Sequence, residues 1–372
     1  MIYKSFQNKQ LSALGLGAMR LPTTNGHIDE AKSAEMVAYA MEKGINYYDT
    51  AWGYHNGESE PMMGKLLSAY PRDSFYLASK FPGYDLANMD KVEEIFEKQL
   101  VRCQVSYFDF YLIHNVCEMN IDAYLDPKYG IYDYLIRQRD AGRIHHLGFS
   151  AHANLDTMRR FLAAYGKDME FCQLQINYVD WTFQQAKEKV DLLREYNIPV
   201  WVMEPVRGGK LANVGGSFAT ALSAIRPEES VVSLAFRFLQ SIPDVVVTLS
   251  GMSNMQQLSE NITTYESEKP LNDAEFAQVL AVAADMLNNM VPCTNCRYCT
   301  EYCPQGLDIP RLIKLYNEHA FTGGGTISKK TLDKIDEDKR PGSCVSCRSC
   351  EAVCPQQIKI SEIMADFDRR LQ

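Results

Sequence analysis

One complete repeat of the fold can be read in residues 75–114, FYLASKFPGYDLANMDKVEEIFEKQLVRCQVSYFDFYLIH. Apolar, β-prone runs occupy both ends, at residues 75–80 and 108–114, and residues 89–102 between them carry apolar side chains at helical spacing. A strand, a helix and a second strand in this order predict a βαβ unit, in which the two strands run parallel. Each of the two strands ends in an ionisable residue, Lys80 or His114.

The same alternation extends through most of the chain. Strand-like runs occur at residues 13–17, 45–49, 75–80, 108–114, 146–150, 171–175, 200–203 and 245–249. Helical patterns lie between them, for example at residues 31–43, 89–102, 155–164, 183–196 and 230–240. Eight strands with eight crossovers in about 250 residues are what a (β/α)8 barrel requires, and we predict this α/β fold. A doubly wound open sheet is the alternative that the same alternation allows.

The composition narrows the class of protein. The chain has 372 residues, 46% of them hydrophobic, as in an ordinary globular protein. Its 38 Lys and Arg against 47 Asp and Glu give a net charge of −9, so no nucleic-acid partner is expected. No apolar run approaches the roughly 18 residues of a membrane span, and the amino-terminal MIYKSFQNKQ has no apolar signal core. We predict a soluble, cytoplasmic protein that does not bind a membrane.

A polar segment ending in proline, residues 266–270, marks the expected domain boundary. The barrel would then occupy residues 1–270, and a smaller, mainly helical domain would occupy residues 271–372. Asn272 and Glu275, three positions later, form a capping-box pattern that predicts the start of a helix. That helix leads into the first of two cysteine motifs.

Eight of the eleven cysteines fall in two copies of the spacing C-x2-C-x2-C-x3-C-P. The first copy contains Cys293, Cys296, Cys299 and Cys303, and the second, displaced by 51 residues, contains Cys344, Cys347, Cys350 and Cys354. Apolar positions at helical spacing follow both prolines, so each half is predicted to be a ligand loop followed by one amphipathic helix. Residues 291–371 resemble bacterial two-cluster ferredoxin domains, and in particular the helical variety that is fused to redox enzymes.

The cysteine spacing favours two 4Fe-4S clusters, in which the fourth cysteine of each motif binds the other cluster. We therefore expect one cluster on Cys293, Cys296, Cys299 and Cys354, and a second cluster on Cys344, Cys347, Cys350 and Cys303. Tetrahedral zinc is the alternative, but zinc sites seldom need four cysteines per run followed by proline. The remaining Cys103, Cys117 and Cys172 lie in strand or helix patterns and are expected to be buried, inert thiols.

Four ionisable side chains, which we call the tetrad, stand at or just after predicted strand ends: Asp49, Tyr54, Lys80 and His114. In a barrel these ends converge at one mouth, where catalytic residues belong. A carbonyl that receives hydride must be protonated, and a tyrosine with a pKa of about 10 is a poor acid near neutral pH. A neighbouring ammonium lowers the pKa of a phenol, a carboxylate keeps the ammonium charged, and a histidine can position the carbonyl. Each residue alone has an ordinary structural explanation, whereas their joint placement predicts a carbonyl-reducing site.

Residues 2–264 resemble the aldo-keto reductase family over an ordered series of segments. These include LGLG at 14–17, NYYDTA at 46–51, LASK at 77–80, YLIH at 111–114, GFS at 148–150, QINY at 175–178 and EN at 260–261. The resemblance implies that Tyr54 is the general acid and base, that Lys80 and Asp49 tune it, and that His114 orients the substrate. It also implies a small carbonyl or alcohol substrate, and a nicotinamide cofactor that lies across the barrel mouth without a Rossmann glycine motif.

The residues that would contact the nicotinamide match the family only in part. The resemblance implies that Ser150 and Gln175 bind the carboxamide, although Ala151 replaces the asparagine that is usual after the serine. Met203 replaces the aromatic residue that usually stacks on the nicotinamide.

The residues that would contact the phosphates also differ from the family. Arg207 and Lys210 are candidates for the pyrophosphate, and Glu260 and Asn261 complete the cofactor-binding positions. Two positions where the family often has cations are occupied by uncharged residues, Gly251 and Gln257. The loss of these charges removes contacts to a 2′-phosphate, so the choice between NADP and NAD stays open.

The two halves handle electrons differently, because a hydride carries two and a 4Fe-4S cluster passes one at a time. Three interpretations follow. The barrel could be a reductase whose clusters exchange electrons with a flavin, either bound at the altered nicotinamide site or carried by a partner. It could reduce carbonyls while the clusters are structural or sense redox state, or it could be a docking scaffold for an electron-transfer module. The tetrad favours the first two, and the expected redox partner is a flavoprotein or a ferredoxin.

Overall fold

The computed structural model describes residues 1–288, 290, 291, 293, 297–321, 332, 333 and 335–371. The chain forms two compact units. The first contains Met1–Gly208 and Glu228–Phe276, and the second contains Gly209–Pro227 and Ala277–Gln372. The domain boundary expected near residue 270 stays a prediction, and residues 209–227 group with the second unit although they follow a barrel strand.

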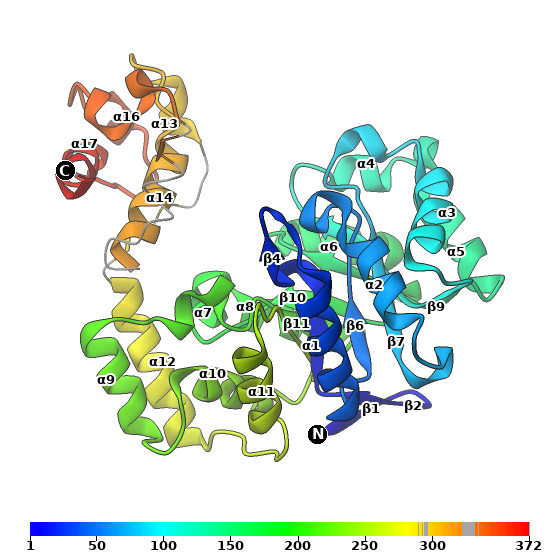
Figure 1. Cartoon of the computed structure of the whole chain (residues 1–372). Helices are drawn as coiled ribbons and strands as arrows, with labels where there is room; N and C mark the ends of the chain where they lie inside the picture. The colour runs from blue at the N-terminus through cyan, green and yellow to red at the C-terminus, as the bar shows by residue number, and fades with distance from the viewer. Residues whose placement is uncertain (289, 292, 294–296, 322–331, 334, 372) are drawn as a thin grey trace. The chain divides into compact units, whose positions relative to one another are not determined.

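The first unit is built on a closed barrel of eight parallel strands (Figure 1). In spatial order the strands are β10 (Cys172–Gln175), β11 (Val200–Met203), β12 (Val245–Ser250), β3 (Leu14–Gly17), β6 (Tyr47–Asp49), β7 (Tyr76–Phe81), β8 (Phe108–Val116) and β9 (Ile144–Ala151). All eight coincide with predicted strands. The closure of the sheet confirms the (β/α)8 fold and excludes the doubly wound open sheet.

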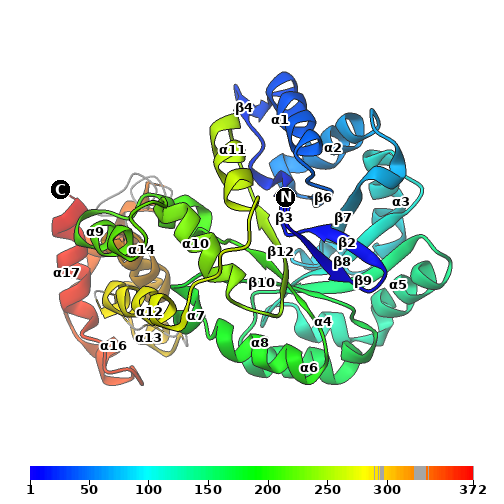
Figure 2. The ribbon, with the colours of Figure 1, turned by 90° about the horizontal axis from the view of Figure 1, so that it is seen from below.

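Helices surround the barrel in the view along its axis (Figure 2). They are α1 (Glu30–Glu42), α2 (Ser59–Leu67), α3 (Val92–Cys103), α4 (Ile121–Leu125), α5 (Ile131–Asp140), α6 (Leu155–Tyr165), α7 (Asp180–Phe183), α8 (Ala186–Glu195), α10 (Val231–Gln240) and α11 (Met255–Thr264). The predicted helices correspond to α1, α3, α6, α8 and α10, with ends that shift by up to three residues. Within the described residues, no helix is both long and apolar enough to cross a membrane.

A short hairpin closes the amino-terminal end of the barrel. It consists of β1 (Tyr3–Phe6) and β2 (Lys9–Ser12), which pair antiparallel. Phe6 and Leu11 are buried in one core with residues from inside the barrel, and the ring of Phe6 lies edge-on to that of Trp201 at 5.1 Å. Because this end is plugged, the carboxyl ends of the strands form the open mouth. A second small hairpin joins β4 (Thr23–Thr24) to β5 (His27–Ile28).

Helices α2 and α3 approach closely at Gly64, which predicts a measurable stability effect. A Cβ at Gly64 would lie 2.5 Å from the carbonyl oxygen of Arg102 and 2.6 Å from the carbonyl carbon of Cys103. Gly64→Ala is therefore expected to lower the free energy of unfolding by about 1–3 kcal/mol, through overpacking. Urea unfolding followed by circular dichroism measures the change. The control Lys65→Ala removes only an exposed ion pair and should change it by less than about 1 kcal/mol.

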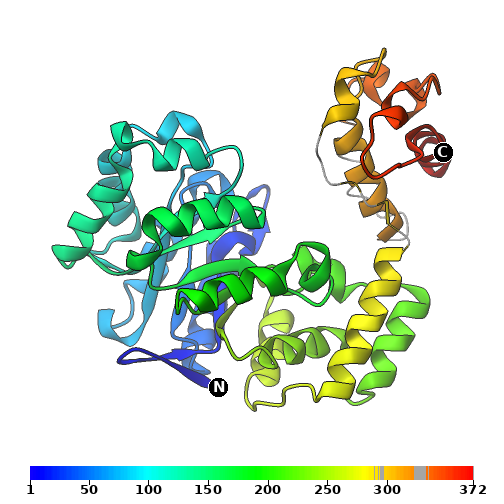
Figure 3. The same ribbon diagram turned by 180° about the vertical axis from the view of Figure 1, so that it is seen from behind.

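The second unit contains the cysteine motifs and is mainly helical in its described residues (Figures 1 and 3). Its helices are α9 (Gly216–Ile225), α13 (Tyr298–Glu301), α14 (Ile309–Phe321), α16 (Ser349–Ala352) and α17 (Ile360–Leu371), together with most of α12 (Asp273–Asn288). The predicted capping box begins α12, since the Asn272 and Glu275 side chains each accept a hydrogen bond from the other's backbone N–H, at 3.0 and 2.9 Å.

The two halves of the cysteine repeat share one apolar core. Helices α14 and α17 follow the two motifs, as predicted, and bury the apolar positions expected from their spacing. The rings of Tyr316 and Phe367 pack edge-on at 5.6 Å, and the Tyr316 hydroxyl donates to Asp366 Oδ2 at 2.8 Å. This pairing ties the equivalent helices of the repeat together.

Candidate active site

The tetrad occupies three neighbouring strands at the open end of the barrel. Asp49 is the last residue of β6, Lys80 lies in β7 and His114 lies in β8. Tyr54 follows β6 and begins a 3-10 turn, Tyr54–Gly57. Strand β7 pairs with both β6 and β8, so the carboxyl ends of these three strands are adjacent.

Lys80 is the centre of the site. Its side chain is fully buried, and its ammonium donates to Asp49 Oδ1 at 2.5 Å and to the carbonyl oxygen of Thr50 at 2.8 Å. The same ammonium lies 3.4 Å from the Tyr54 hydroxyl. A charged lysine, its counter-ion and a phenol are therefore in direct contact, which is the arrangement expected from the sequence.

Burial and charge act against each other on these groups. Burial raises the pKa of Tyr54 above its usual value, and the Lys80 ammonium offsets this only in part. Burial also lowers the pKa of Lys80, but Asp49 and Tyr54 outweigh it and hold the lysine pKa above its usual value. The sequence argument anticipated the pull of the lysine on the phenol but not the larger opposing effect of burial. Tyr54 is therefore a protonated phenol, able to donate, throughout the neutral range.

His114 completes the site as a neutral ring. Burial, and then the nearby Lys80 charge, lower its pKa well below the usual value. Its ring centroid lies 6.3 Å from that of Tyr54 and 5.3 Å from that of Tyr84. The Tyr124 hydroxyl donates to the backbone oxygen of His114 at 2.6 Å. Nδ1 of His114 is buried and has no hydrogen-bond partner within the described residues, so the ring retains a polar atom for another group.

A buried polar network supports the strand that carries Lys80. The Gln99 side chain donates to the backbone oxygen of Lys80 at 3.0 Å and to Glu60 Oε1 at 2.6 Å. Glu60 also accepts from Ser79 Oγ at 2.7 Å. Asp49 has a second support, because Gln173 Nε2 lies 3.5 Å from its Oδ2. Gln99 and Gln173 were not identified from the sequence. The only feature that could have indicated them is a polar side chain at a position where the strand or helix pattern predicts burial.

The three residues expected to contact the nicotinamide lie at the carboxyl ends of strands β9, β10 and β11. Ser150 is buried in β9, and its hydroxyl accepts from the Asn115 backbone N–H at 2.8 Å. Gln175 ends β10, and half-buried Met203 ends β11. These three strands are neighbours in the barrel and open at the same end as the tetrad.

Other expected cofactor residues are engaged elsewhere in the structure. Arg207 Nε lies 3.2 Å from Oδ2 of the fully buried Asp180, which also accepts from Gln175 at 2.8 Å. Lys210 belongs to the second unit, where its ammonium lies 3.0 Å from Glu318 Oε1 of α14. Sequence reasoning missed both acidic partners.

The last two expected cofactor residues lie on α11. Glu260 is exposed and accepts from Gln256 at 2.8 Å. Asn261 is buried and donates to Ser250 Oγ at 3.1 Å, at the end of β12. Asn261 therefore holds the end of a barrel strand, whereas Glu260 is open to solvent.

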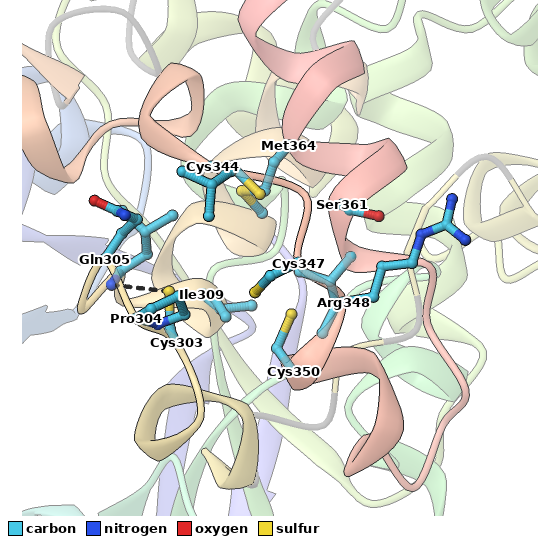
Figure 4. Close-up of a pocket in the computed structure, with 13 residues that line it drawn as sticks. Cys303, Pro304, Gln305, Ile309, Cys344, Cys347, Arg348, Cys350, Ser361 and Met364 are labelled. Atoms are coloured by element: carbon cyan, nitrogen blue, oxygen red, sulfur yellow. Dashed lines mark hydrogen bonds between the residues drawn. The ribbon is translucent and has the colours of Figure 1, made fainter.

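Three cysteines of the second motif and one cysteine of the first line a common cavity (Figure 4). The sulfur atoms of Cys303, Cys344, Cys347 and Cys350 face this space, which measures about 340 Å³ including a part open to solvent. The backbone N–H of Leu307 lies 3.5 Å from Cys303 Sγ. The grouping of Cys303 with the second motif is the crossed set expected from the sequence, and four thiols around one space suit a cluster of several iron atoms.

A second space of about 310 Å³, which also includes a part open to solvent, is lined by Cys293, Cys299 and Cys354. This cavity also combines cysteines of both motifs, because Cys354 belongs to the second motif whereas Cys293 and Cys299 belong to the first. Cys296, the remaining cysteine expected here, lies outside the described residues. In the part of the chain that the structure describes, no three His, Cys, Asp or Glu side chains converge closely enough to hold a single metal ion.

The three cysteines outside the motifs are buried, as predicted. Cys103 and Cys172 are almost completely enclosed, and burial raises the pKa of both thiols well above the usual value. A thiol that stays protonated is a poor nucleophile and a poor metal ligand.

Comparison with known proteins extends these observations. "Probable aldo-keto reductase 1" of Glycine max is 28% identical over 218 residues, which cover 56% of this chain and 60% of that relative. "NADH-specific methylglyoxal reductase" of Escherichia coli (strain K12) is 24% identical over 321 residues, covering 74% of this chain and 96% of the relative. The crystal structure of an aldo-keto reductase from Klebsiella pneumoniae in complex with NADPH has a TM-score of 0.61 at 18% identity, over 76% of this chain and 96% of its own, and therefore shows the fold.

Two family models match the chain in its two parts. The model of the Aldo/keto reductase family matches residues 13–284, and that of a 4Fe-4S dicluster domain matches residues 292–359. The first match contains the whole barrel with the tetrad, and the second contains all eight motif cysteines. The chain belongs to the aldo/keto reductase family and carries a 4Fe-4S dicluster domain in its C-terminal part.

Proposed function

We propose that the barrel reduces a small aldehyde or ketone to the alcohol, or catalyses the reverse oxidation, with a nicotinamide cofactor and with Tyr54 as the proton donor. The observation that carries this proposal is the contact of the buried Lys80 ammonium with both Asp49 and the Tyr54 hydroxyl. Burial in a low-dielectric site strengthens this contact. A purely structural ion pair would be complete with Lys80 and Asp49, and its stability would not depend on the half-buried Tyr54 phenol at the open end of the barrel.

The chemistry assigned to the chain is proton transfer and positioning. A bound nicotinamide would supply the hydride. Tyr54 gives its proton to the carbonyl oxygen as negative charge develops there, and the Lys80 ammonium stabilises the phenolate left behind. Neutral His114 offers a ring nitrogen to the carbonyl and fixes its orientation. The Asp49 carboxylate keeps Lys80 charged and aimed at Tyr54.

Ser150, Gln175 and Met203 are the residues we assign to the nicotinamide end of the cofactor. Their strand ends adjoin one another and supply a hydroxyl, a carboxamide and a soft apolar surface. Nothing in the fold or the comparisons supports the flavin considered from the sequence.

The nucleotide and the substrate are tested together. The name of the Escherichia coli relative makes NADH and methylglyoxal the first probes, and NADPH the matched alternative. Dinucleotide binding is measured by fluorescence on anaerobically purified full-length protein, and turnover by loss of absorbance of the reduced nicotinamide. Binding of either dinucleotide with carbonyl-dependent oxidation supports the proposal, and binding of neither contradicts it.

We further propose that the dicluster domain holds two 4Fe-4S clusters that exchange single electrons with a protein partner. The supporting observation is that Cys347, which lines the larger cavity, is exposed, so a cluster there would reach the surface. Electron transfer needs such an approach, whereas a purely structural cluster gains nothing from it. Full reduction of the visible cluster absorption by a reduced ferredoxin or flavodoxin would support this role, and reduction by dithionite alone would favour a structural role.

The effect of Lys80 on Tyr54 predicts a shift in the pH profile. Reduction requires protonated Tyr54, which is present below the phenol pKa and lost above it. Lys80 lowers that pKa, so Lys80→Met should raise it further and move the alkaline limb of kcat/KM for reduction to higher pH. The reverse oxidation, which needs the phenolate, should slow at any fixed pH. Rates of reduction and oxidation measured from about pH 6 to 10.5 test this, with Lys65→Met as a surface control; an alkaline limb for reduction that enters this range in Lys80→Met, or an oxidation rate that does not fall, would contradict it.

A further inference from the structure

Arg20 lies over the mouth of the barrel, where three neighbouring strands end. It follows β3, the first strand of the barrel, at the end of a short 3-10 turn, Ala18–Arg20. Strand β3 pairs with β12, which in turn pairs with β11. The Arg20 side chain is 44% exposed, so its guanidinium is accessible at the same end of the barrel as the tetrad.

The Arg20 side chain fills the space left by a missing side chain at Gly251. A Cβ on Gly251 would lie 3.1 Å from each of Cβ, Cγ and Cδ of Arg20. Gly251 is one of the two positions where the sequence lacks the cations expected at the phosphate end of the cofactor. The glycine at residue 251 therefore leaves room for the side chain of Arg20, a cation from the first strand-to-helix connection of the barrel.

The guanidinium itself rests between two residues that follow β11. Its Nη2 lies 3.7 Å from Glu204 Oε1, and a Cβ on Gly208 would lie 3.0 Å from the same Nη2. Glu204 and Gly208 both have left-handed backbone conformations, with φ of 56° and 66°. Such a conformation is strained for Glu204, a non-glycine residue, and strained backbone concentrates at binding sites. An ion pair at this distance between partly exposed side chains is weak. Glu204 therefore orients the Arg20 guanidinium and still leaves it able to bind another anion.

We infer that Arg20 binds a phosphate group of the nicotinamide dinucleotide and takes over the role of the absent cations. The inference rests on the proposed function, since it concerns the same cofactor. The strand order supports it: the nicotinamide residues end β9 to β11, and Arg20 lies over the next ends, β11, β12 and β3. Arg207 and Lys210, the cations first expected there, are held by Asp180 and Glu318. A guanidinium forms charge-assisted, paired hydrogen bonds to phosphate oxygens.

Binding measurements on the anaerobically purified full-length protein test the inference. Arg20→Gln should raise the Kd of NADH or NADPH by about tenfold or more, the expected loss of one charge-assisted contact. It should also weaken the dependence of that Kd on salt, because one screened charge is gone. The matched control Arg159→Gln removes an exposed arginine from α6 and should leave both quantities unchanged. Unchanged affinity for both dinucleotides in Arg20→Gln would overturn the inference.

Two arms of the experiment separate the phosphate sources. An equal loss for NADH and NADPH assigns Arg20 to the diphosphate that both share, and a loss for NADPH alone assigns it to the 2′-phosphate. If Arg20→Gln does not fold, Gly251→Val displaces the arginine chain without removing its charge; weaker binding then supports the inference and unchanged binding overturns it. Failure of the unaltered protein to bind either dinucleotide would instead refute the proposed function, so the two failures are distinguishable.

Discussion

Replacing Tyr54 with phenylalanine should lower kcat for carbonyl reduction by about 100- to 10,000-fold, the usual contribution of a general acid. The substitution removes only the hydroxyl that lies 3.4 Å from Lys80 Nζ and leaves the ring in its contact with His114. Dinucleotide binding should stay close to that of the unaltered protein. Steady-state turnover of methylglyoxal and binding by fluorescence, measured on the same sample, separate these two effects.

The matched control for Tyr54 is Tyr84, the other phenol beside His114. Its ring centroid lies 5.3 Å from that of His114, but it makes no hydrogen bond to Lys80 in the described part of the chain. Tyr84→Phe should therefore keep kcat within about threefold, as expected for an aromatic wall that loses only a hydroxyl. Full activity in Tyr54→Phe, with loss in Tyr84→Phe, would move the proton donor to Tyr84 and reject the proposed role of Tyr54.

The second large effect concerns the crossed cysteines. Cys354→Ser should remove the cluster expected on Cys293, Cys296 and Cys299, and iron should fall from about eight to about four atoms per chain. The physical reason is that Cys354 lines the same cavity as Cys293 and Cys299. Iron and sulfide assays on anaerobically purified protein measure the loss, and Cys117→Ser, outside both motifs, serves as the control.

Double variants decide which cluster Cys354 serves. If the motifs cross, adding Cys299→Ser to Cys354→Ser should remove no further iron, because both residues hold the same cluster. Adding Cys350→Ser to Cys354→Ser should remove the second cluster as well. The uncrossed arrangement predicts the reverse order of losses, and that result would reject the pairing of Cys303 with Cys344, Cys347 and Cys350.

Most of the fold could be predicted because its signals are local. Each barrel strand is a short apolar run, and the runs at residues 75–80 and 108–114 differ from the strands Tyr76–Phe81 and Phe108–Val116 by at most two residues. The capping box at Asn272 and the apolar faces of α14 and α17 are also local patterns, and both formed as expected. Helix α2 was not identified from the sequence, because its nine residues include Pro61 and Gly64, two residue types with low helix propensity.

The tetrad was predictable for a related reason. Polar residues at the ends of buried parallel strands have to emerge at one edge, so Asp49, Lys80 and His114 could be placed together before their distances were known. Their electrostatics could not be predicted, because burial depends on residues far away in the chain. Burial raises the pKa of Tyr54 more than Lys80 lowers it, and no local pattern reports how much water reaches residue 54.

Hydrophobic periodicity and the spacing of ionisable and thiol side chains determined the barrel, the repeated cysteine domain and the identity of the tetrad, because these signals depend only on neighbours along the chain. Closure of the sheet decided the rest. It brings β3 beside β12, and so places Arg20 in the space at Gly251, about 230 residues later in the chain. Packing of other elements pairs Arg207 with Asp180 and Lys210 with Glu318, the two cations that the sequence suggested for the phosphates. Contacts between distant residues depend on where a closed sheet and packed helices place them, and only the folded chain supplies that information.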